Sequence, residues 1–151
     1  MTLTPALQEL ARIADRAGEV ILRHYAGVTF ARAKADASPV TEADLLAHEW
    51  IKENLKITGY PVRSEEGGSF PEMDWTKMDY YWLVDPLDGT REFIQRNGEF
   101  TVNIALIHQS VPLLGVVYAP ANRLLYAGGP DLGLFYRQCD MSPVSSEELS
   151  A

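Results

Sequence analysis

The sequence predicts an α+β domain in which two N-terminal helices pack on a mostly antiparallel sheet. Apolar residues recur at helical spacing in the early part of the chain, and short apolar runs separated by turn residues fill the remainder. Two helices followed by an antiparallel meander bury their apolar surfaces against each other. The chain has 151 residues, of which 46% are hydrophobic, so we expect a single domain over residues 1–151 with a substantial core.

The first helix is expected to begin at Thr4 and Pro5, an N-cap residue followed by proline at the first helical position. An apolar stripe at helical spacing follows as far as Gly27 and consists of Leu7, Leu10, Ala14, Ala17 and Ile21. Residues 31–39 lose this periodicity, so we expect them to form a polar, alanine-rich connection.

The second helix is expected to begin after Thr41, which can act as its N-cap, and to end near Gly59. Asp44 then lies in its first turn. The apolar positions of this helix are Leu45, His48, Ile51 and Leu55. Because a histidine on the apolar face of a helix is usually packed, we assign no chemical role to His48.

Six strands are expected in the rest of the chain. The first two cover residues 60–63 and 80–84, on either side of a loop at 67–71. Four more apolar segments, separated by turn residues, cover residues 101–107, 111–118, 123–127 and 132–137. Consecutive segments of this kind pair as antiparallel hairpins, which predicts the mostly antiparallel sheet. We assign Tyr80, Tyr81 and Trp82 to the core rather than to a ligand-stacking surface.

The composition limits the classes of partner. The formal net charge is −8, from 21 acidic and 13 basic residues, and no basic run is present that could follow a phosphate backbone. This excludes nucleic acid polymers as the expected ligand. A small anionic ligand on so acidic a protein needs positive charge from another source, and divalent metal cations are the natural one.

Two further observations concern the cellular environment. The single cysteine, Cys139, cannot form an intrachain disulfide. The N-terminal residues do not follow the pattern of a secretory signal, and no apolar run reaches membrane-spanning length. We therefore expect a cytoplasmic protein.

Carboxylates follow two of the expected strands. Glu65 and Glu66 stand at the end of one, and Asp85 and Asp88 stand at the end of another, within the segment WLVDPLDGTREFI. Magnesium binds several oxygen ligands, and carboxylates at adjacent strand ends can converge on such an ion. Because proline restricts the backbone and glycine permits a tight turn, Asp85, the Leu87 carbonyl and Asp88 can face one cation together.

The residues that follow the carboxylates favour an anion site. Backbone N–H groups at Gly89 and Thr90, where a helical turn opens, can hold a phosphate oxygen, and Thr90 adds a hydroxyl. Each group also has a simpler interpretation. The pattern D-P-x-D-G is typical of a β-turn, and a pair of glutamates is typical of a solvated edge. Thr41 with Asp44 is typical of a helix cap. All three groups stand at the ends of expected apolar segments, which favours a site for phosphoryl transfer.

These residues resemble the inositol monophosphatase-like superfamily of metal-dependent phosphatases. The resemblance rests on three segments in order, KADASPVTEAD at 34–44, SEE at 64–66 and WLVDPLDGTREFI at 82–94, and it covers residues 4 to about 137. SPVTEAD, the TREF continuation and RNGEFTVNIAL at 96–106 are most similar to the CysQ-type 3′(2′),5′-bisphosphate nucleotidases. Glu92 stands where inositol monophosphatases typically carry asparagine. The resemblance implies the N-terminal domain of the layered αβαβα sugar-phosphatase fold.

The resemblance implies roles for individual residues. The implied magnesium ligands are Glu65, Asp85, the Leu87 carbonyl and Asp88, with Glu65 and Asp85 on a first cation and Asp85 and Asp88 on a second. Thr90 and Asp44 form the implied catalytic pair that orients and deprotonates the attacking water. The implied substrate-binding residues are Gly89, Thr90 and Glu65, with the Gly89 and Thr90 amides on the phosphate. Glu66 either supports the water shell of the cation or serves the structure alone.

The implied activity is that of a magnesium-dependent phosphomonoesterase in sulfur metabolism, which removes the 3′-phosphate of adenosine 3′,5′-bisphosphate to give AMP and phosphate. Two alternatives remain open, a phosphatase of inositol or other sugar phosphates, and an inactive metal-binding or oligomerising fragment. The family also leaves open a homo-oligomer and peripheral association with the inner membrane, which some members show.

The second half of these phosphatases carries a Trp-Asp-x-Ala-Ala-Gly motif whose aspartate completes the metal site. The tryptophans of this chain are Trp50, Trp75 and Trp82, and none of them is followed by aspartate. We therefore expect the chain to correspond to the N-terminal, metal-binding half, with the C-terminal half absent and with reduced activity on its own.

Overall fold

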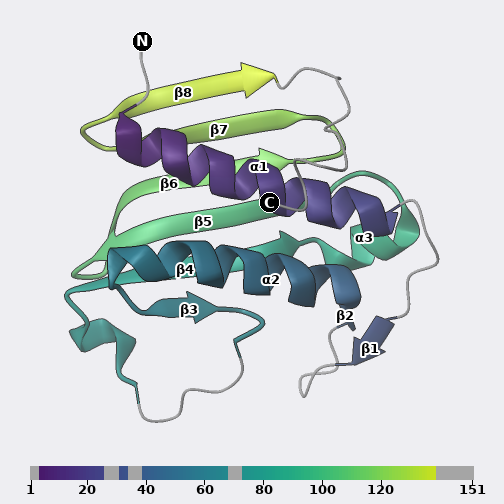
Figure 1. Ribbon diagram of the computed structural model, residues 1–151, viewed down its shortest axis with the longest axis horizontal. Coiled ribbons are helices and arrows are strands. Elements are labelled where there is room, and N and C mark those ends of the chain that lie inside the picture. Colours follow the sequence, from purple (N-terminus) through teal and green to yellow (C-terminus); the bar gives the residue numbers. More distant parts are fainter. Residues whose placement is uncertain (1–3, 26–30, 34–38, 68–72, 139–151) are drawn as a thin grey trace.

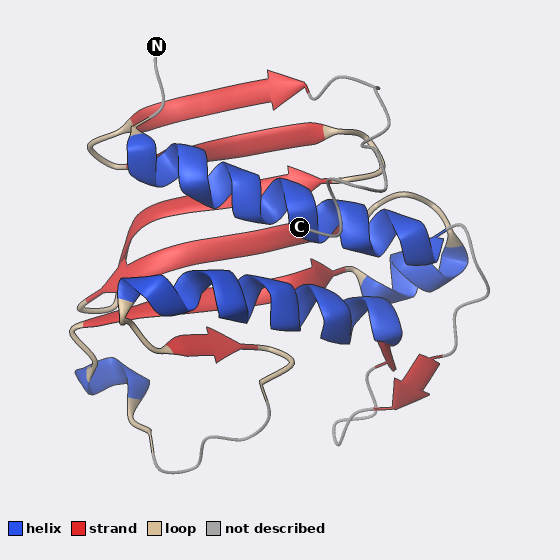
Figure 2. Cartoon of the chain, in the orientation of Figure 1, coloured by secondary structure: helices blue, strands red, loops and turns tan. Residues whose placement is uncertain are grey.

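Two long helices lie side by side across one face of a six-stranded sheet in the computed structural model, which describes residues 4–25, 31–33, 39–67 and 73–138 (Figure 1, Figure 2). The strands follow one another across the sheet in chain order, from β3 to β8. β3 (Val62–Ser64) runs parallel to β4 (Tyr80–Asp88), and each later pair is antiparallel. The later strands are β5 (Thr101–His108), β6 (Val111–Ala119), β7 (Leu124–Gly129) and β8 (Gly133–Gln138). The predicted α+β class is confirmed.

Helix α1 (Pro5–Tyr25) buries the whole of the predicted apolar stripe and packs on β5, β6 and β7. Gly18 allows the close approach to the sheet, because a Cβ at this position would lie 2.3 Å from a ring carbon of Tyr118. The helix ends at Tyr25. The predicted end near Gly27 lies outside the described residues.

Helix α2 (Glu42–Leu55) packs on α1, β3 and β4. Its first turn is closed by the predicted capping box, in which the Asp44 N–H donates to Thr41 Oγ1 and the Thr41 N–H donates to Asp44 Oδ2. A short 3-10 helix, η1 (Lys56–Thr58), continues the chain, and Gly59 ends it in the left-handed region with a φ of 74°. Both predicted ends of this helix are therefore confirmed.

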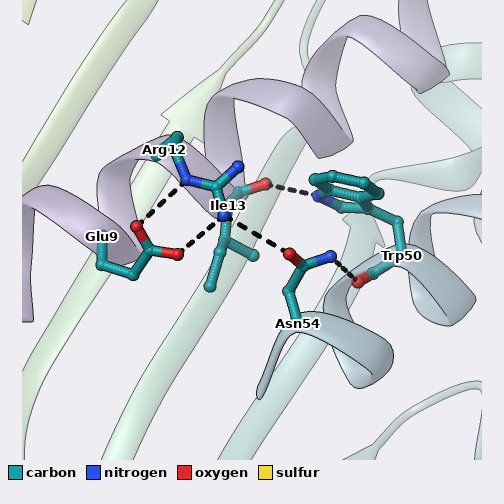
Figure 3. A network of polar contacts seen from close by, with 5 residues as sticks. All are labelled: Glu9, Arg12, Ile13, Trp50 and Asn54. Atoms are coloured by element: carbon teal, nitrogen blue, oxygen red, sulfur yellow. Dashed lines mark hydrogen bonds and ion pairs between the residues drawn. The ribbon is translucent and has the colours of Figure 1, made fainter. Parts of the chain in front are cut away.

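Polar contacts tie the outer surfaces of α1 and α2 together (Figure 3). The indole N–H of Trp50 donates to the Ile13 carbonyl at 3.1 Å, and Asn54 Nδ2 donates to the Trp50 carbonyl at 2.8 Å. Arg12 binds Glu9 through Nε at 3.0 Å and Nη2 at 2.7 Å, and Nη2 also donates to Asn54 Oδ1 at 3.4 Å. The charged pair is exposed and contributes less than about 1 kcal/mol, so the apolar stripe beneath it is the main stabilising contact.

Five elements differ from the sequence-based expectation. Residues 31–39 were predicted to be a polar, alanine-rich connection, but β1 (Ala31–Ala33) and β2 (Pro39–Thr41) pair as a two-stranded antiparallel ribbon. Strand β4 does not end at residue 84 but continues to Asp88, with an irregularity in its pairing to β5. A short helix, α3 (Thr90–Gln95), follows directly, and a 3-10 turn, η2 (Trp75–Lys77), precedes β4. The predicted loop lies at 67–71, of which only residue 67 is described.

The two faces of the sheet are covered differently in the described part of the chain. Both helices lie on one face, where Trp82 and Val84 join the buried core. The opposite face forms a groove of ≈ 1190 Å³ lined by apolar strand residues and by the ends of β3, β4 and β5. Exposed apolar residues in this groove include Leu83, Val117, Tyr126 and Leu134. In the described segments, we find no helix that is long and apolar enough to cross a membrane.

Candidate active site

The carboxyl ends of β3 and β4 bring two of the predicted ligands together. The two strands are parallel with Ser64 opposite Val84, so Glu65 and Asp85 come directly after a matched pair. The Glu65 N–H donates to the Val84 carbonyl at 3.1 Å, which extends the pairing up to the first carboxylate. Both side chains line the groove on the open face of the sheet. Parallel pairing explains why residues far apart in sequence share one edge.

Asp88 reaches the same area through a bulge in β4. Asp85 pairs with Asn103 and Asp88 pairs with Thr101, so β4 contains one more residue than β5 across this interval. A bulge of this kind bends the strand and changes the direction of the side chains that follow it. Asn103 Nδ2 donates to Asp88 Oδ2 at 3.2 Å across the bulge. The predicted local turn is therefore an irregular strand end, and it still brings both carboxylates to one site.

A buried carboxylate links α2 to α3. Asp44 is 0% exposed. Its Oδ2 accepts from the Thr41 N–H at 2.9 Å and from Thr41 Oγ1 at 2.5 Å, and its Oδ1 accepts from Thr90 Oγ1 at 2.8 Å. Asp44 is therefore a helix cap, as one of the two sequence-based interpretations predicts, and it is also the hydrogen-bond acceptor of Thr90. Its catalytic role stays a prediction. A carboxylate with three donors is stable in the interior without a cationic partner.

Gly89 connects the carboxylates to α3 with a backbone conformation that suits glycine. Its φ is 92°, and a Cβ would lie 2.8 Å from the Glu99 carbonyl oxygen. Gly89 is the N-cap of α3, and no side chain caps the N–H groups of this short helix. Thr90 follows, and its hydroxyl donates to Asp44 Oδ1 and, at 3.3 Å, to the Leu87 carbonyl. The tight turn therefore places backbone donors, a hydroxyl and a carbonyl oxygen beside the carboxylates.

Burial and neighbouring negative charges disfavour ionisation of the Asp85 carboxyl group. Burial raises the pKa of Asp85 to about 8, helped by a hydrogen bond with the Glu65 side chain and by the negative charges of Glu65 and Asp88. The Leu87 N–H acts in the opposite direction. Two oxygens here, Asp85 Oδ1 and Asn103 Oδ1, are buried and have no hydrogen-bond partner among the described residues. The site therefore contains more acceptors and more negative charge than its own donors satisfy.

These observations fit a divalent cation. In the described residues no three His, Cys, Asp or Glu side chains converge closely enough to hold a metal ion by themselves. Magnesium does not need such a group, because it keeps several waters and binds through one or two carboxylates plus other oxygens. Asp85, Asp88 and the Leu87 carbonyl offer such oxygens, and a positive charge would relieve the repulsion at Asp85.

The structure also brings forward residues to which the sequence assigned no role. His48 is buried, and its Nδ1 lies 2.8 Å from Ser64 Oγ, which in turn accepts from the Glu66 N–H at 3.3 Å. Asn103 lies opposite Asp85 and contacts Asp88. Neither contact follows from a local motif, because the first depends on the packing of α2 against β3 and the second on the pairing of β4 with β5. Trp82 and Tyr81 are buried as predicted, and Tyr80 stacks on Tyr60 and His108.

Comparisons with known proteins agree with this arrangement. A family model described as the inositol monophosphatase family matches residues 3–151. The 3′(2′),5′-bisphosphate nucleotidase CysQ of Salmonella typhimurium is 50% identical over 127 residues, which cover 80% of this chain and 50% of that protein.

Two solved structures share the fold. CysQ from Bacteroides thetaiotaomicron, a bacterial member of the inositol monophosphatase family, superimposes with a TM-score of 0.73 at 39% identity, covering 96% of this chain and 55% of that one. The extragenic suppressor protein suhB from Bartonella henselae gives a TM-score of 0.78 at 28% identity, covering 92% of this chain and 55% of that one. The chain thus spans about half the length of the relatives it matches. Since the family match extends over residues 3–151, the chain belongs to the inositol monophosphatase family.

Proposed function

We propose that this chain is the N-terminal, metal-binding half of a magnesium-dependent phosphomonoesterase that acts on adenosine 3′,5′-bisphosphate. The 3′-phosphate would be released, with AMP as the second product. Relatives named as 3′(2′),5′-bisphosphate nucleotidases support this substrate class. The observation that carries the proposal is the 2.8 Å hydrogen bond from Thr90 Oγ1 to Asp44 Oδ1, next to the repelling carboxylates of the bulge.

Thr90 and Asp44 would activate the attacking water. The Thr90 hydroxyl proton is directed at Asp44 Oδ1, so the lone pairs of Thr90 Oγ1 are oriented to accept a proton from water. As that proton moves to Thr90, the hydroxyl proton can move to Asp44. The donors from Thr41 hold the other oxygen of Asp44, which keeps the carboxylate in place during the transfer.

The carboxylates would hold the cation and the turn would hold the phosphate. The proposed magnesium ligands are Glu65, Asp85, the Leu87 carbonyl and Asp88. Bound magnesium supplies charge neutralisation for the phosphate and lowers the pKa of water toward neutrality. The Gly89 and Thr90 amides would contact the phosphate oxygens, since no side chain caps this end of α3. Glu65 would contact the substrate as well.

Phosphate release from adenosine 3′,5′-bisphosphate in the presence of magnesium tests the proposal. We expect Asp88→Asn to abolish release and Thr90→Val to lower kcat by about a hundredfold or more, because it removes the general-base pair. Thr90→Ser keeps the hydroxyl and should retain most of the rate. Thr76→Val is a matched control, since it breaks a similar hydrogen bond, 2.6 Å from Thr76 Oγ1 to Asp74 Oδ1, away from the site.

Two alternatives have their own outcomes in the same assay. Faster phosphate release from an inositol or sugar phosphate than from the bisphosphate would favour the first alternative, a phosphatase of inositol or other sugar phosphates. Glu92 argues against this alternative, because inositol monophosphatases typically carry asparagine at that position. Magnesium binding without turnover by this chain, together with turnover by a version extended to the length of its relatives, would favour a metal-binding fragment that needs its second half.

Three expectations from the sequence stay predictions. These are the cytoplasmic location, the peripheral membrane association and the homo-oligomer. The proposed roles of the site residues also require that residues 1–151 form one domain, which stays a prediction. Sedimentation of the purified chain, with and without anionic lipid vesicles, measures association with itself and with a membrane surface.

A further inference from the structure

Asn103 lies where the carboxylates of β4 meet the neighbouring strand. It is the residue opposite Asp85 in the antiparallel pairing of β4 and β5, at the last regular pair before the bulge. Directly opposite residues carry their side chains on the same face of a sheet, about 5 Å apart at Cβ. Asn103 therefore faces the groove that Glu65 and Asp85 also line.

The two ends of the Asn103 amide have different surroundings. Nδ2 donates to Asp88 Oδ2 at 3.2 Å, across the bulge. Oδ1 is buried and has no hydrogen-bond partner within the described residues, and the same is true of Asp85 Oδ1 on the facing strand. A buried acceptor without a donor is costly, and such groups in native proteins usually mark an ion, a water or a ligand.

We propose that Asn103 is a positioning residue of the cation site. Its amide N–H holds Oδ2 of Asp88, which would leave the other oxygen of this exposed carboxylate for the cation, and its own buried Oδ1 would be a neutral acceptor for the water shell. This inference rests on the magnesium site of the proposed function. A neutral oxygen suits the position, because a fourth carboxylate beside Glu65, Asp85 and Asp88 would add to their repulsion.

A purely structural role for Asn103 makes the opposite prediction. If the side chain only joined β4 to β5 at the bulge, its loss would destabilise the metal-free protein and leave the cation affinity unchanged. A positioning role affects the cation, since partners that orient metal ligands typically contribute a factor of about 10 to 100 in metal affinity. The two roles are separated by measuring affinity and unfolding on the same variant.

The experiment compares Asn103→Leu with Asn122→Leu by calorimetric titration with magnesium. Leucine matches asparagine in size and removes both ends of the amide, while Asn122 lies exposed in the turn between β6 and β7. We expect Asn103→Leu to weaken magnesium binding by about 10- to 100-fold. The urea midpoint of the metal-free protein should not fall, because an unpaired buried oxygen has been removed. Asn122→Leu should change neither quantity.

A double variant tests whether Asn103 acts through Asp88. In an Asp88→Asn background, the further change Asn103→Leu should weaken magnesium binding by less than about threefold, since the ligand it positions is already gone. In the unaltered chain, the side-chain amide signals of Asn103 should shift on addition of magnesium in ¹H–¹⁵N spectra. Equal affinity for Asn103→Leu and the unaltered chain overturns this inference alone. Absence of magnesium binding by the unaltered chain overturns both the inference and the proposed magnesium dependence.

Discussion

The two ends of β4 differ in whether their carboxylates have hydrogen-bond donors. At its start, His108 Nε2 lies 3.1 Å from Asp79 Oδ1, and Gln109 donates to Asp79 through its backbone N–H and its side chain. Tyr80 packs between Tyr60 and His108, with ring centroids 5.0 and 4.2 Å away. At this aromatic end, the carboxylate has donors and the rings cover one another.

At the other end of β4, the carboxylate end, the balance is reversed. Asp85 is flanked by Glu65 and Asp88, its pKa is raised to about 8, and one of its oxygens has no partner in the described part of the chain. One strand thus combines an end whose polar groups are satisfied with an end that lacks positive charge. We therefore interpret the aromatic end as serving the fold and the carboxylate end as a candidate binding site.

The sharpest test of this comparison is Asp85→Asn. We expect magnesium affinity to fall by about a hundredfold or more, because one of the proposed ligands is lost. We also expect the metal-free protein to become more stable by about 1 kcal/mol, since asparagine has no ionised form for burial, Glu65 and Asp88 to disfavour. Calorimetric titration and urea unfolding in the presence of a chelator measure the two effects.

The matched change at the aromatic end is Asp79→Asn. It should leave magnesium affinity unchanged and lower the free energy of unfolding by less than about 1 kcal/mol, since the contact of Asp79 with His108 is largely exposed. If both substitutions destabilised the metal-free protein to the same extent, the distinction between the two ends of β4 would be wrong.

A pair of glycines provides the second test. Gly89, at the carboxylate end, has a φ of 92°, and an added Cβ would lie 2.8 Å from a backbone carbonyl oxygen. Gly59, which precedes β3, has a φ of 74° and nothing within 4 Å of an added Cβ. We expect Gly89→Ala to lower the free energy of unfolding by about 2 kcal/mol or more, and Gly59→Ala by about 1 kcal/mol. Urea unfolding of both variants checks the order, and equal losses would show that the close contact at Gly89 is relieved by a small shift.

Much of this fold is readable from local patterns. The apolar stripe of α1 and the capping box of α2 predict both helices because each depends on residues within a few positions of one another. The strands from β5 to β8 follow from apolar runs between turns. The β1–β2 ribbon was missed because strands of three residues are too short to show alternation.

In the candidate site too, residues in local motifs were predicted, whereas contacts between distant segments were missed. Asp44, Thr90, Asp85 and Asp88 stand in short motifs, so the sequence points to them, and the 2.8 Å contact of Thr90 with Asp44 agrees with that reading. Asn103 was missed because its place opposite Asp85 depends on the register of β4 and β5, which changes at the bulge. His48 is buried, as its place on the apolar face of α2 predicts, but its contact with Ser64 was missed because Ser64 lies on another element, 16 residues away. Long-range register is not encoded in any single motif.

His48 provides the smallest of the expected effects, and it concerns pH. Burial lowers the pKa of His48, whose ring contacts Ser64 and lies near Glu49 and Lys52. A histidine with a lowered pKa stabilises the fold when neutral, and this stability is lost as the pH falls below the unfolded value of about 6.5. We expect this group to lower the free energy of unfolding by up to about 1 kcal/mol between pH 7.5 and pH 5, a change that the raised pKa of Asp85 opposes in the same range. His48→Gln, measured by urea unfolding at both pH values with a chelator present, should reduce that loss, whereas His108→Gln at the aromatic end should keep it. An unchanged pH dependence in His48→Gln would mean that other groups cause the acid sensitivity, and that the contact with Ser64 serves only to hold β3 beside α2.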